Sequence, residues 1–181
     1  MKRNIKRVAV IGSGVMGSRI ACHFANVGLD VLLLDIVPKE AKESTNKMAR
    51  NKIVNDALKA SLKSNPSPIY SKSYASRITT GNLEDDIHLI SKADWIIEVV
   101  VERLDIKQIV FGNIEKHRKP GTIISSNTSG IPIHMMLEGR SEDFQKHFLG
   151  THFFNPRSYI KLYEVIPTPK TDPAVVYFLM E

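Results

Sequence analysis

Short apolar runs alternate with longer mixed segments along most of the chain. The clearest runs are almost continuously apolar and cover residues 7–11, 31–34, 95–101 and 122–124. Runs of this length are typical of parallel strands that are buried on both faces. Between these runs we predict one further short strand and several helices, at residues 78–80 and at 18–26, 83–91, 104–117 and 133–137. The alternation predicts an α/β fold, with a doubly wound, mainly parallel sheet and helices on both faces.

Two parts of the chain depart from this simple alternation. Pro38 can begin a helix, and residues 39–62 are rich in helix formers, so we predict a helical insert after the second strand. Near the C-terminus, the apolar runs 148–154 and 162–166 are joined by a connection too short for a helical crossover. These two strands should therefore pair antiparallel. Asp172 is then expected to cap a final helix.

A glycine-rich turn follows the first predicted strand. It has the pattern G-x-G-x-x-G, with a strand before it and a helix after it. The first glycine allows the tight turn, the second lets the backbone approach a pyrophosphate, and the third lets the helix pack closely on the strand. The helix N-terminus adds N–H donors and partial positive charge. The pattern predicts a Rossmann-type fold whose dinucleotide site includes Gly12, Ser13, Gly14, Val15, Met16 and Gly17.

Asp35 follows the second predicted strand, about 20 residues after the glycine turn, where an acidic residue binds the adenosine ribose of a dinucleotide. A carboxylate at this place repels the 2′-phosphate of NADP. The next residues, Ile36 and Val37, offer no cation to hold such a phosphate. The expected cofactor is therefore NAD.

His152 and Glu164 lie at the ends of two successive apolar runs. If these runs pair as strands, a carboxylate comes within reach of an imidazole and fixes its tautomer, which is the arrangement of a general base. Hydride leaves a carbon only as the proton of its hydroxyl group departs, so a dehydrogenase needs such a base. A dinucleotide site and a proton-transfer pair in one chain together predict a dehydrogenase.

Composition limits the remaining alternatives. The 181 residues suffice for one well-cored domain, and we expect a single domain over residues 1–181. No apolar run approaches the roughly 18–20 residues that a membrane helix needs. The single cysteine, Cys22, excludes an internal disulfide and fits a reducing compartment, so we expect a cytoplasmic protein.

The net charge is +6, and much of it lies in residues 2–7 and 39–63. Such lysine-rich stretches are either solvated helix faces or surfaces for an anion. The sequence has no RNP-type, zinc-finger or helix-turn-helix signature, so we expect no nucleic-acid partner and favour a small phosphate-bearing ligand. The histidines other than His152 have no partner at metal-ligand spacing, so we predict no metal site.

Four motifs carry a family resemblance. They are the glycine turn, residues 94–102 (DWIIEVVVE), residues 126–129 (SNTS) and residues 152–156 (HFFNP). Their order and spacing resemble the NAD-binding domain of L-3-hydroxyacyl-CoA dehydrogenases across almost the whole chain. Residues 81–86 (GNLEDD) look most like the large bacterial fatty-acid oxidation proteins. Those proteins also carry an enoyl-CoA hydratase region and a helical C-terminal domain, to which residues 172–181 would begin the connection.

The resemblance implies a fatty-acid β-oxidation step, in which L-3-hydroxyacyl-CoA is oxidised to 3-ketoacyl-CoA. His152 would take the proton from the 3-hydroxyl group, and Glu164 would hold and stabilise the imidazolium. Ser129 would bind the substrate oxygen and border the cofactor. A further residue from the helical domain completes the site in this family, so binding of NAD without full turnover is an alternative for the chain by itself.

The resemblance also implies contacts with the two larger ligands. Glu102 and Lys107 correspond to contacts near the nicotinamide ribose, and Asn155 borders the nicotinamide. Lys52 and Lys59 lie in the insert that matches the CoA-facing region of the family. For these two lysines, contact with the phosphates of CoA and a merely solvated helix face remain alternatives.

Three functions are therefore alternatives for this sequence. The first is an NAD-dependent 3-hydroxyacyl-CoA dehydrogenase, and the second is another dehydrogenase of small β-hydroxyacids. The second group relies on a lysine acid/base, and His152 with Glu164 speaks against it. The third is an NAD-binding module without activity of its own. The family dimerises largely through its helical domain, so an oligomer of the full-length protein is compatible with all three.

Overall fold

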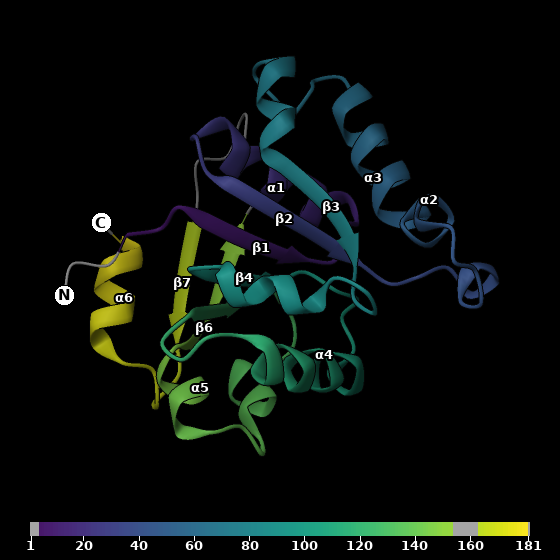
Figure 1. The fold of residues 1–181 in the computed structure, drawn as a ribbon. Helices are drawn as coiled ribbons and strands as arrows, with labels where there is room; N and C mark the ends of the chain where they lie inside the picture. The colour runs from purple at the N-terminus through teal and green to yellow at the C-terminus, as the bar shows by residue number, and fades with distance from the viewer. Residues whose placement is uncertain (1–3, 154–162, 181) are drawn as a thin grey trace.

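The computed structural model describes residues 4–153 and 163–180 (Figure 1). The described strands form one seven-stranded sheet in the order β3-β2-β1-β4-β5-β6-β7. Their bounds are β1 Arg7–Ile11, β2 Asp30–Asp35, β3 Ile78–Asn82, β4 Trp95–Glu98, β5 Ile123–Ser126, β6 Phe148–Phe153 and β7 Tyr163–Pro167. β1 to β6 are parallel, and β7 pairs antiparallel with β6. The strand order reverses between β1 and β4, where open α/β sheets bind their ligands.

Helices cover both faces of this sheet. The α-helices are α1 Val15–Asn26, α2 Lys47–Arg50, α3 Lys52–Lys63, α4 Leu104–His117, α5 Glu142–Lys146 and α6 Pro173–Met180. The 3-10 helices of the described residues are η1 Lys39–Ala41, η2 Lys72–Arg77, η3 Ile87–Lys92 and η4 Ile133–Leu137. Among the described residues, no helix is long and apolar enough to cross a membrane. The α/β fold with a mainly parallel, doubly wound sheet is thus confirmed.

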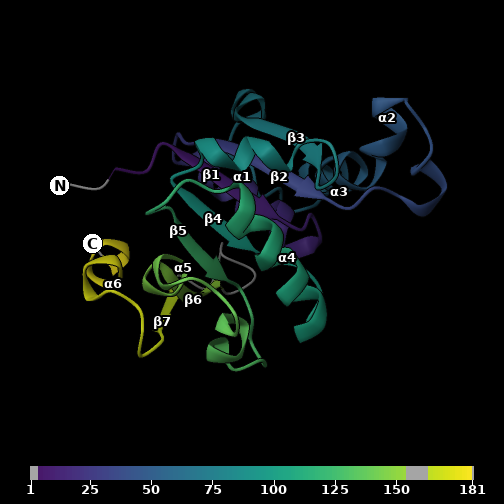
Figure 2. The same cartoon turned by 60° about the horizontal axis from the view of Figure 1, so that its bottom comes forward.

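Alternate residues of the strands pack in two separate cores, because successive side chains of a strand point to opposite faces of the sheet. Val8 and Val10 of β1 pack in the core under α1, α3 and α6. Ala9 and Ile11 pack in the core under η3, α4, η4 and α5. Figure 2 shows α4 in front of the strands and α1 behind them, and Figure 1 shows α6 beside β7.

The two C-terminal strands, β6 and β7, pair antiparallel as predicted. In their register, His152 of β6 lies opposite Glu164 of β7. The final helix α6 begins as expected, because Asp172 Oδ1 accepts a hydrogen bond from the N–H of Ala174 at 2.8 Å. The backbone therefore places the two candidate proton-transfer residues side by side.

The predicted helical insert over residues 39–62 is present, but it does not form one continuous helix. The insert consists of η1, the single turn α2 and then α3. Asn46 interrupts it, because its side chain accepts a hydrogen bond from the N–H of Met48 and caps α2. The guanidinium of Arg50 also donates to the carbonyl of Lys42 at 2.6 Å and to the carboxylate of Asp85. Competing bonds of this kind hold residues 42–46 outside a helix.

Three smaller predictions also need correction. Residues 83–91 are helical only from Ile87, because the side chain of Asn82 accepts bonds from the N–H groups of Glu84 and Asp85 and forms a turn. β3 continues through Asn82, two residues beyond the predicted strand at residues 78–80. β4 ends at Glu98, three residues earlier than predicted, because the carboxylate of Glu98 bonds the N–H of Val100 and turns the chain.

Phe148→Ala should test the core on the α4 side. Phe148 is fully buried, and its ring centroid lies 5.2 Å from that of Phe111 and 5.6 Å from that of Phe144. We expect the cavity to lower the free energy of unfolding by about 3–5 kcal/mol in urea denaturation. Tyr177→Ala, at a side chain that is 70% exposed, is the control and should change it by less than about 0.5 kcal/mol. Equal effects of the two substitutions would contradict this core.

Candidate active site

The glycine turn is shaped by close backbone contacts. Gly12 has φ +103°, which favours glycine, and a Cβ there would lie 2.6 Å from the carbonyl oxygen of Val99. A Cβ on Gly17 would lie 1.8 Å from the carbonyl oxygen of Gly12. Gly14 differs, because no heavy atom lies within 4 Å of the position its Cβ would take. The open space is thus at the second glycine, as the predicted dinucleotide site requires.

Asp35 at the end of β2 is tied to the glycine turn. Its Oδ2 accepts hydrogen bonds from the backbone N–H of Ser13 at 2.6 Å and from the Ser13 hydroxyl group. Its Oδ1 accepts the N–H of Ile36 at 2.7 Å. These bonds hold the carboxylate beside the turn, at the carboxyl edge of the sheet. The structure therefore brings together the residues predicted for the adenosine side of the cofactor.

His152 and Glu164 form the predicted pair. His152 Nδ1 lies 3.0 Å from Glu164 Oε2, and the two residues are direct cross-strand neighbours. An ionised carboxylate can only accept, so the paired ring nitrogen is the one that carries the hydrogen. The basic atom of this imidazole is then Nε2.

One cavity of about 520 Å³ joins the glycine turn to His152. Its walls come from the start of α1, the turn after β4, the end of β5 and the end of β6. They are formed by Gly14, Val15, Met16, Val99, Val100, Val101, Asn127, Ser129, His152 and Phe153. The two halves of the predicted site, which are over 130 residues apart in sequence, therefore face one space.

Asn127 is a residue of this cavity that the sequence analysis did not single out. Its N–H donates to the carbonyl oxygen of Glu98 at 2.9 Å, and its Oδ1 accepts the N–H of Phe153 at 2.9 Å. The side chain thus fixes the end of β6, one residue after His152. The available signal was its place in the polar segment 125–129, which follows the apolar run 122–124 and also contains the predicted Ser129.

Glu102 organises the loop that carries Ser129. Its Oε1 accepts hydrogen bonds from the hydroxyl group of Thr128 and from the N–H groups of Ser129 and Gly130, at 3.1 and 2.9 Å for the last two. Burial of the carboxyl raises its pKa, but these hydrogen bonds and the charge of Lys107 outweigh burial and lower the pKa to about 2. Glu102 is therefore a carboxylate at neutral pH, with Oε2 turned to Lys107.

Lys107 was predicted as a direct cofactor contact, but its side chain is only 1% exposed. Its Nζ lies 2.7 Å from Glu98 Oε1 and 3.3 Å from Glu102 Oε2. Glu98 is fully buried and was missed by the sequence analysis. The available signal was a single carboxylate inside the apolar run 95–101, since a buried charge requires a partner.

Two of the other predicted contacts, Lys52 and Lys59, are not among the described residues that line the cavity. Asn155 lies outside the described residues. Lys52 pairs with Asp56 on the solvent side of α3, and Lys59 lies on the same exposed side. A hollow of about 390 Å³ separates α3 from the glycine turn, but α3 lines it with small residues such as Ala57. Ala57 lies about 140° around the helix axis from Lys52 and about 160° from Lys59. Contact of the two lysines with CoA stays a prediction.

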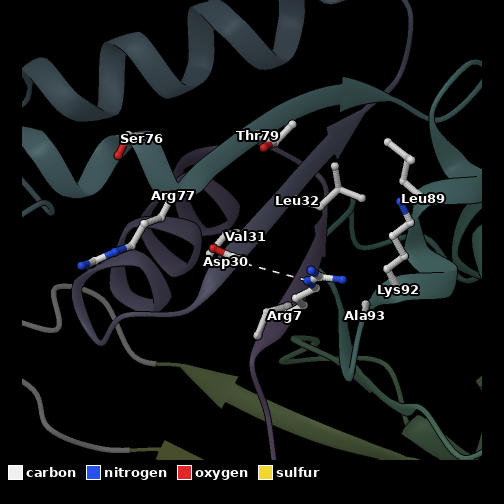
Figure 3. Close-up of a pocket in the computed structure, with 11 residues that line it drawn as sticks. Arg7, Asp30, Val31, Leu32, Ser76, Arg77, Thr79, Leu89, Lys92 and Ala93 are labelled. Atoms are coloured by element: carbon white, nitrogen blue, oxygen red, sulfur yellow. Dashed lines mark ion pairs between the residues drawn. The ribbon is translucent and has the colours of Figure 1, made fainter.

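A further hollow, of about 420 Å³, lies at the opposite edge of the sheet (Figure 3). Three cations border it, but Arg7 faces Asp30 at 3.9 Å and Arg77 is turned away and donates to the carbonyl of Ala25. It contains none of the predicted site residues. Among the described residues, no group of three or more histidine, cysteine or acidic side chains is arranged to hold a metal ion.

The lowered pKa of Glu102 predicts that its contribution to the stability of the fold depends on pH. The carboxylate is stabilised in the folded protein, so its contribution is complete above the ordinary value of 4.5 and is lost as the pH falls toward 2. Glu102→Gln should therefore lower the urea midpoint more near pH 6 than near pH 3. The side chain is 42% exposed, which keeps this difference modest. A difference that does not change with pH would contradict the role of the charge.

The chain is similar in sequence to known NAD-dependent dehydrogenases. Residues 7–181 match the family described as "3-hydroxyacyl-CoA dehydrogenase, NAD binding domain". The chain is 51% identical to a "probable 3-hydroxyacyl-CoA dehydrogenase" of Bacillus subtilis (strain 168), with 99% of the chain and 24% of that protein covered. It is 49% identical to a protein of the same name from Deinococcus radiodurans, with 95% and 48% covered.

Solved structures show the same similarity. The fold superposes on 3-hydroxybutyryl-CoA dehydrogenase from Escherichia coli with a TM-score of 0.72 and 31% sequence identity, covering 97% of this chain and 35% of that one. The chain thus spans about a quarter to a half of the length of the curated relatives it matches. It belongs to the family of NAD-binding domains of 3-hydroxyacyl-CoA dehydrogenases.

Proposed function

We propose that the protein oxidises L-3-hydroxyacyl-CoA to 3-ketoacyl-CoA with NAD, as a step of fatty-acid β-oxidation. The observation that carries this proposal is the contact between His152 Nδ1 and Glu164 Oε2 on the wall of the cavity that also contains the glycine turn. A base with a fixed tautomer and a dinucleotide site in one cavity are the two requirements of such an oxidation. The family membership supports the 3-hydroxyacyl-CoA class of substrate.

The chain's own residues fit NAD. The space at Gly14 admits a pyrophosphate, and the N–H groups at the start of α1 lie beside it. Asp35 would bind the adenosine ribose on the β2 side of β1. The rest of the dinucleotide would then extend past Glu102, on the β4 side, toward His152. When bound, NAD supplies the acceptor for the hydride that leaves the substrate carbon.

His152 would move the proton in this reaction. Its Nε2 would accept the proton of the 3-hydroxyl group, and Glu164 would stabilise the imidazolium that forms. General base catalysis of this kind contributes roughly 10²–10⁴-fold to the rate. The Ser129 hydroxyl group would bind the substrate oxygen, and the bonds of Glu102 to the N–H groups of Ser129 and Gly130 would hold it there.

The greater length of the relatives supports a further domain that would complete the site. We infer that a helical C-terminal domain of the longer protein covers the cavity and completes the acyl-CoA site. Lys52 and Lys59 remain candidates for the CoA phosphates, and Asn155 for the nicotinamide. The buried, unbridged thiol of Cys22 supports a cytoplasmic location. Because the chain spans about a quarter to a half of the length of these relatives, a module that binds NAD without turnover is the second candidate.

Two glycine substitutions should separate cofactor binding from folding. Gly14 has φ −53° and no neighbour near its Cβ position, so Gly14→Ala should fold as wild type but lose at least about tenfold in NADH affinity, because the methyl group occupies the pyrophosphate space. Gly17→Ala should instead lower the melting temperature, because of its clash with Gly12. Calorimetric titration and thermal denaturation measure the two effects. Unchanged NADH affinity of Gly14→Ala would contradict the proposed site.

Turnover tests the proton-transfer pair. We expect acetoacetyl-CoA-dependent oxidation of NADH, followed by nicotinamide absorbance, to be lost in His152→Ala. Glu164→Gln should lower kcat by about 10²-fold while NADH affinity changes little, since the carboxylate acts through the imidazole. Equal losses of rate and NADH affinity would contradict this role. NADH binding without any wild-type turnover would instead select the silent module, and equal turnover of free acetoacetate would select another β-hydroxyacid dehydrogenase.

A further inference from the structure

We propose that Glu98 is a positioning residue for the cofactor site: it shares the charge of Lys107 with Glu102 and so keeps the Glu102 carboxylate available to the ribose on the nicotinamide side. This inference rests on the NAD site proposed above. It concerns a side chain that touches neither the cavity nor any proposed ligand position.

The Glu98 carboxylate is fully buried, and its hydrogen bonds reach three different segments. Oε1 accepts from Lys107 Nζ on α4 and from the N–H of Val100 in the turn after β4, each at 2.7 Å. Oε2 accepts from the Ser126 hydroxyl group at the end of β5 at 2.5 Å. The carboxylate is therefore well satisfied, as a buried charge must be.

One ammonium group stands between two carboxylates. Lys107 Nζ is closer to Glu98, at 2.7 Å, than to Glu102, at 3.3 Å. A buried ammonium group needs a partner of opposite charge. If the charge of Glu98 is removed, Glu102 becomes the only carboxylate within 4 Å of Lys107 among the described ion pairs. The ammonium group would then move toward Glu102 Oε2.

Glu102 is the member of this trio that can meet a ligand. Its side chain is 42% exposed, whereas Glu98 and Lys107 are buried. Its Oε1 already accepts three bonds from residues 128–130, so Oε2 is the oxygen left to accept a ribose hydroxyl group. Asp35 and Glu102 lie on opposite sides of β1, which places Glu102 toward the second ribose of a dinucleotide.

The test compares two ligands that differ by this ribose. ADP-ribose contains both riboses without nicotinamide, and ADP ends at the pyrophosphate. We expect wild type to bind ADP-ribose more tightly than ADP in calorimetric titration. Glu98→Gln should weaken ADP-ribose binding by about tenfold, the range of a hydrogen bond to a charged group, and change ADP binding by less than about twofold.

A second variant tests whether Glu98 acts through Glu102. Glu102→Gln removes the carboxylate that Glu98 is proposed to keep available, and it leaves Lys107 in place. In the Glu102→Gln background, Glu98→Gln should change ADP-ribose binding by less than about threefold, because the carboxylate through which it acts is gone. A purely structural role of Glu98 predicts the same tenfold loss in both backgrounds, which would overturn the proposal. If Glu98→Gln alone fails to fold, Glu98→Asp gives the same comparison: a loss of ADP-ribose binding confined to the background with Glu102 supports the proposal, and equal losses overturn it.

The remaining outcomes separate this proposal from the function on which it rests. Unchanged ADP-ribose binding in Glu98→Gln, equal losses for both ligands, or equal wild-type affinity for the two ligands would overturn the role of Glu98 and leave the NAD site intact. Wild-type protein that binds neither ligand would overturn the NAD site and the role of Glu98 with it.

Discussion

The site depends on a steric constraint where three backbone segments meet. The end of β1, the turn after β4 and the first turn of α1 approach so closely that neither Gly12 nor Gly17 has room for a Cβ. This contact fixes the start of α1 above the carboxyl ends of the strands. Only Gly14 in the same turn faces open space, so one short stretch of backbone both packs the fold and leaves the room that a pyrophosphate needs.

A second constraint, of register, acts at the other end of the cavity. His152 and Glu164 meet because β6 and β7 pair antiparallel with these residues opposite one another. A slip by one residue would move one side chain to the opposite face of the sheet. The distance between imidazole and carboxylate is therefore set by backbone hydrogen bonds, and Asn127 adds a side-chain bond to the end of β6.

Site residues could be predicted from the sequence where their role depends on a position at the end of a strand. The glycine turn, Asp35 and the pair His152 and Glu164 all lie at strand ends, and strand ends are visible as the limits of apolar runs. Glu98 and Lys107 were not paired by this reasoning, because their contact depends on how α4 folds back on β4. The break in the insert was missed partly for the same reason, since Asp85, one of the residues that Arg50 bonds, is remote in sequence.

The place of Glu164 on the last strand has a consequence for the order in which the molecule is assembled. The residues of the proposed adenosine half, from the glycine turn to Asp35, all lie in the first 35 positions and on neighbouring strands. The imidazole of His152 receives its carboxylate only when β7 adds to the sheet edge. During synthesis the residues of the proposed adenosine half thus emerge long before Glu164, and the proposed proton-transfer pair forms only after β7, the last of the described strands, has joined the sheet.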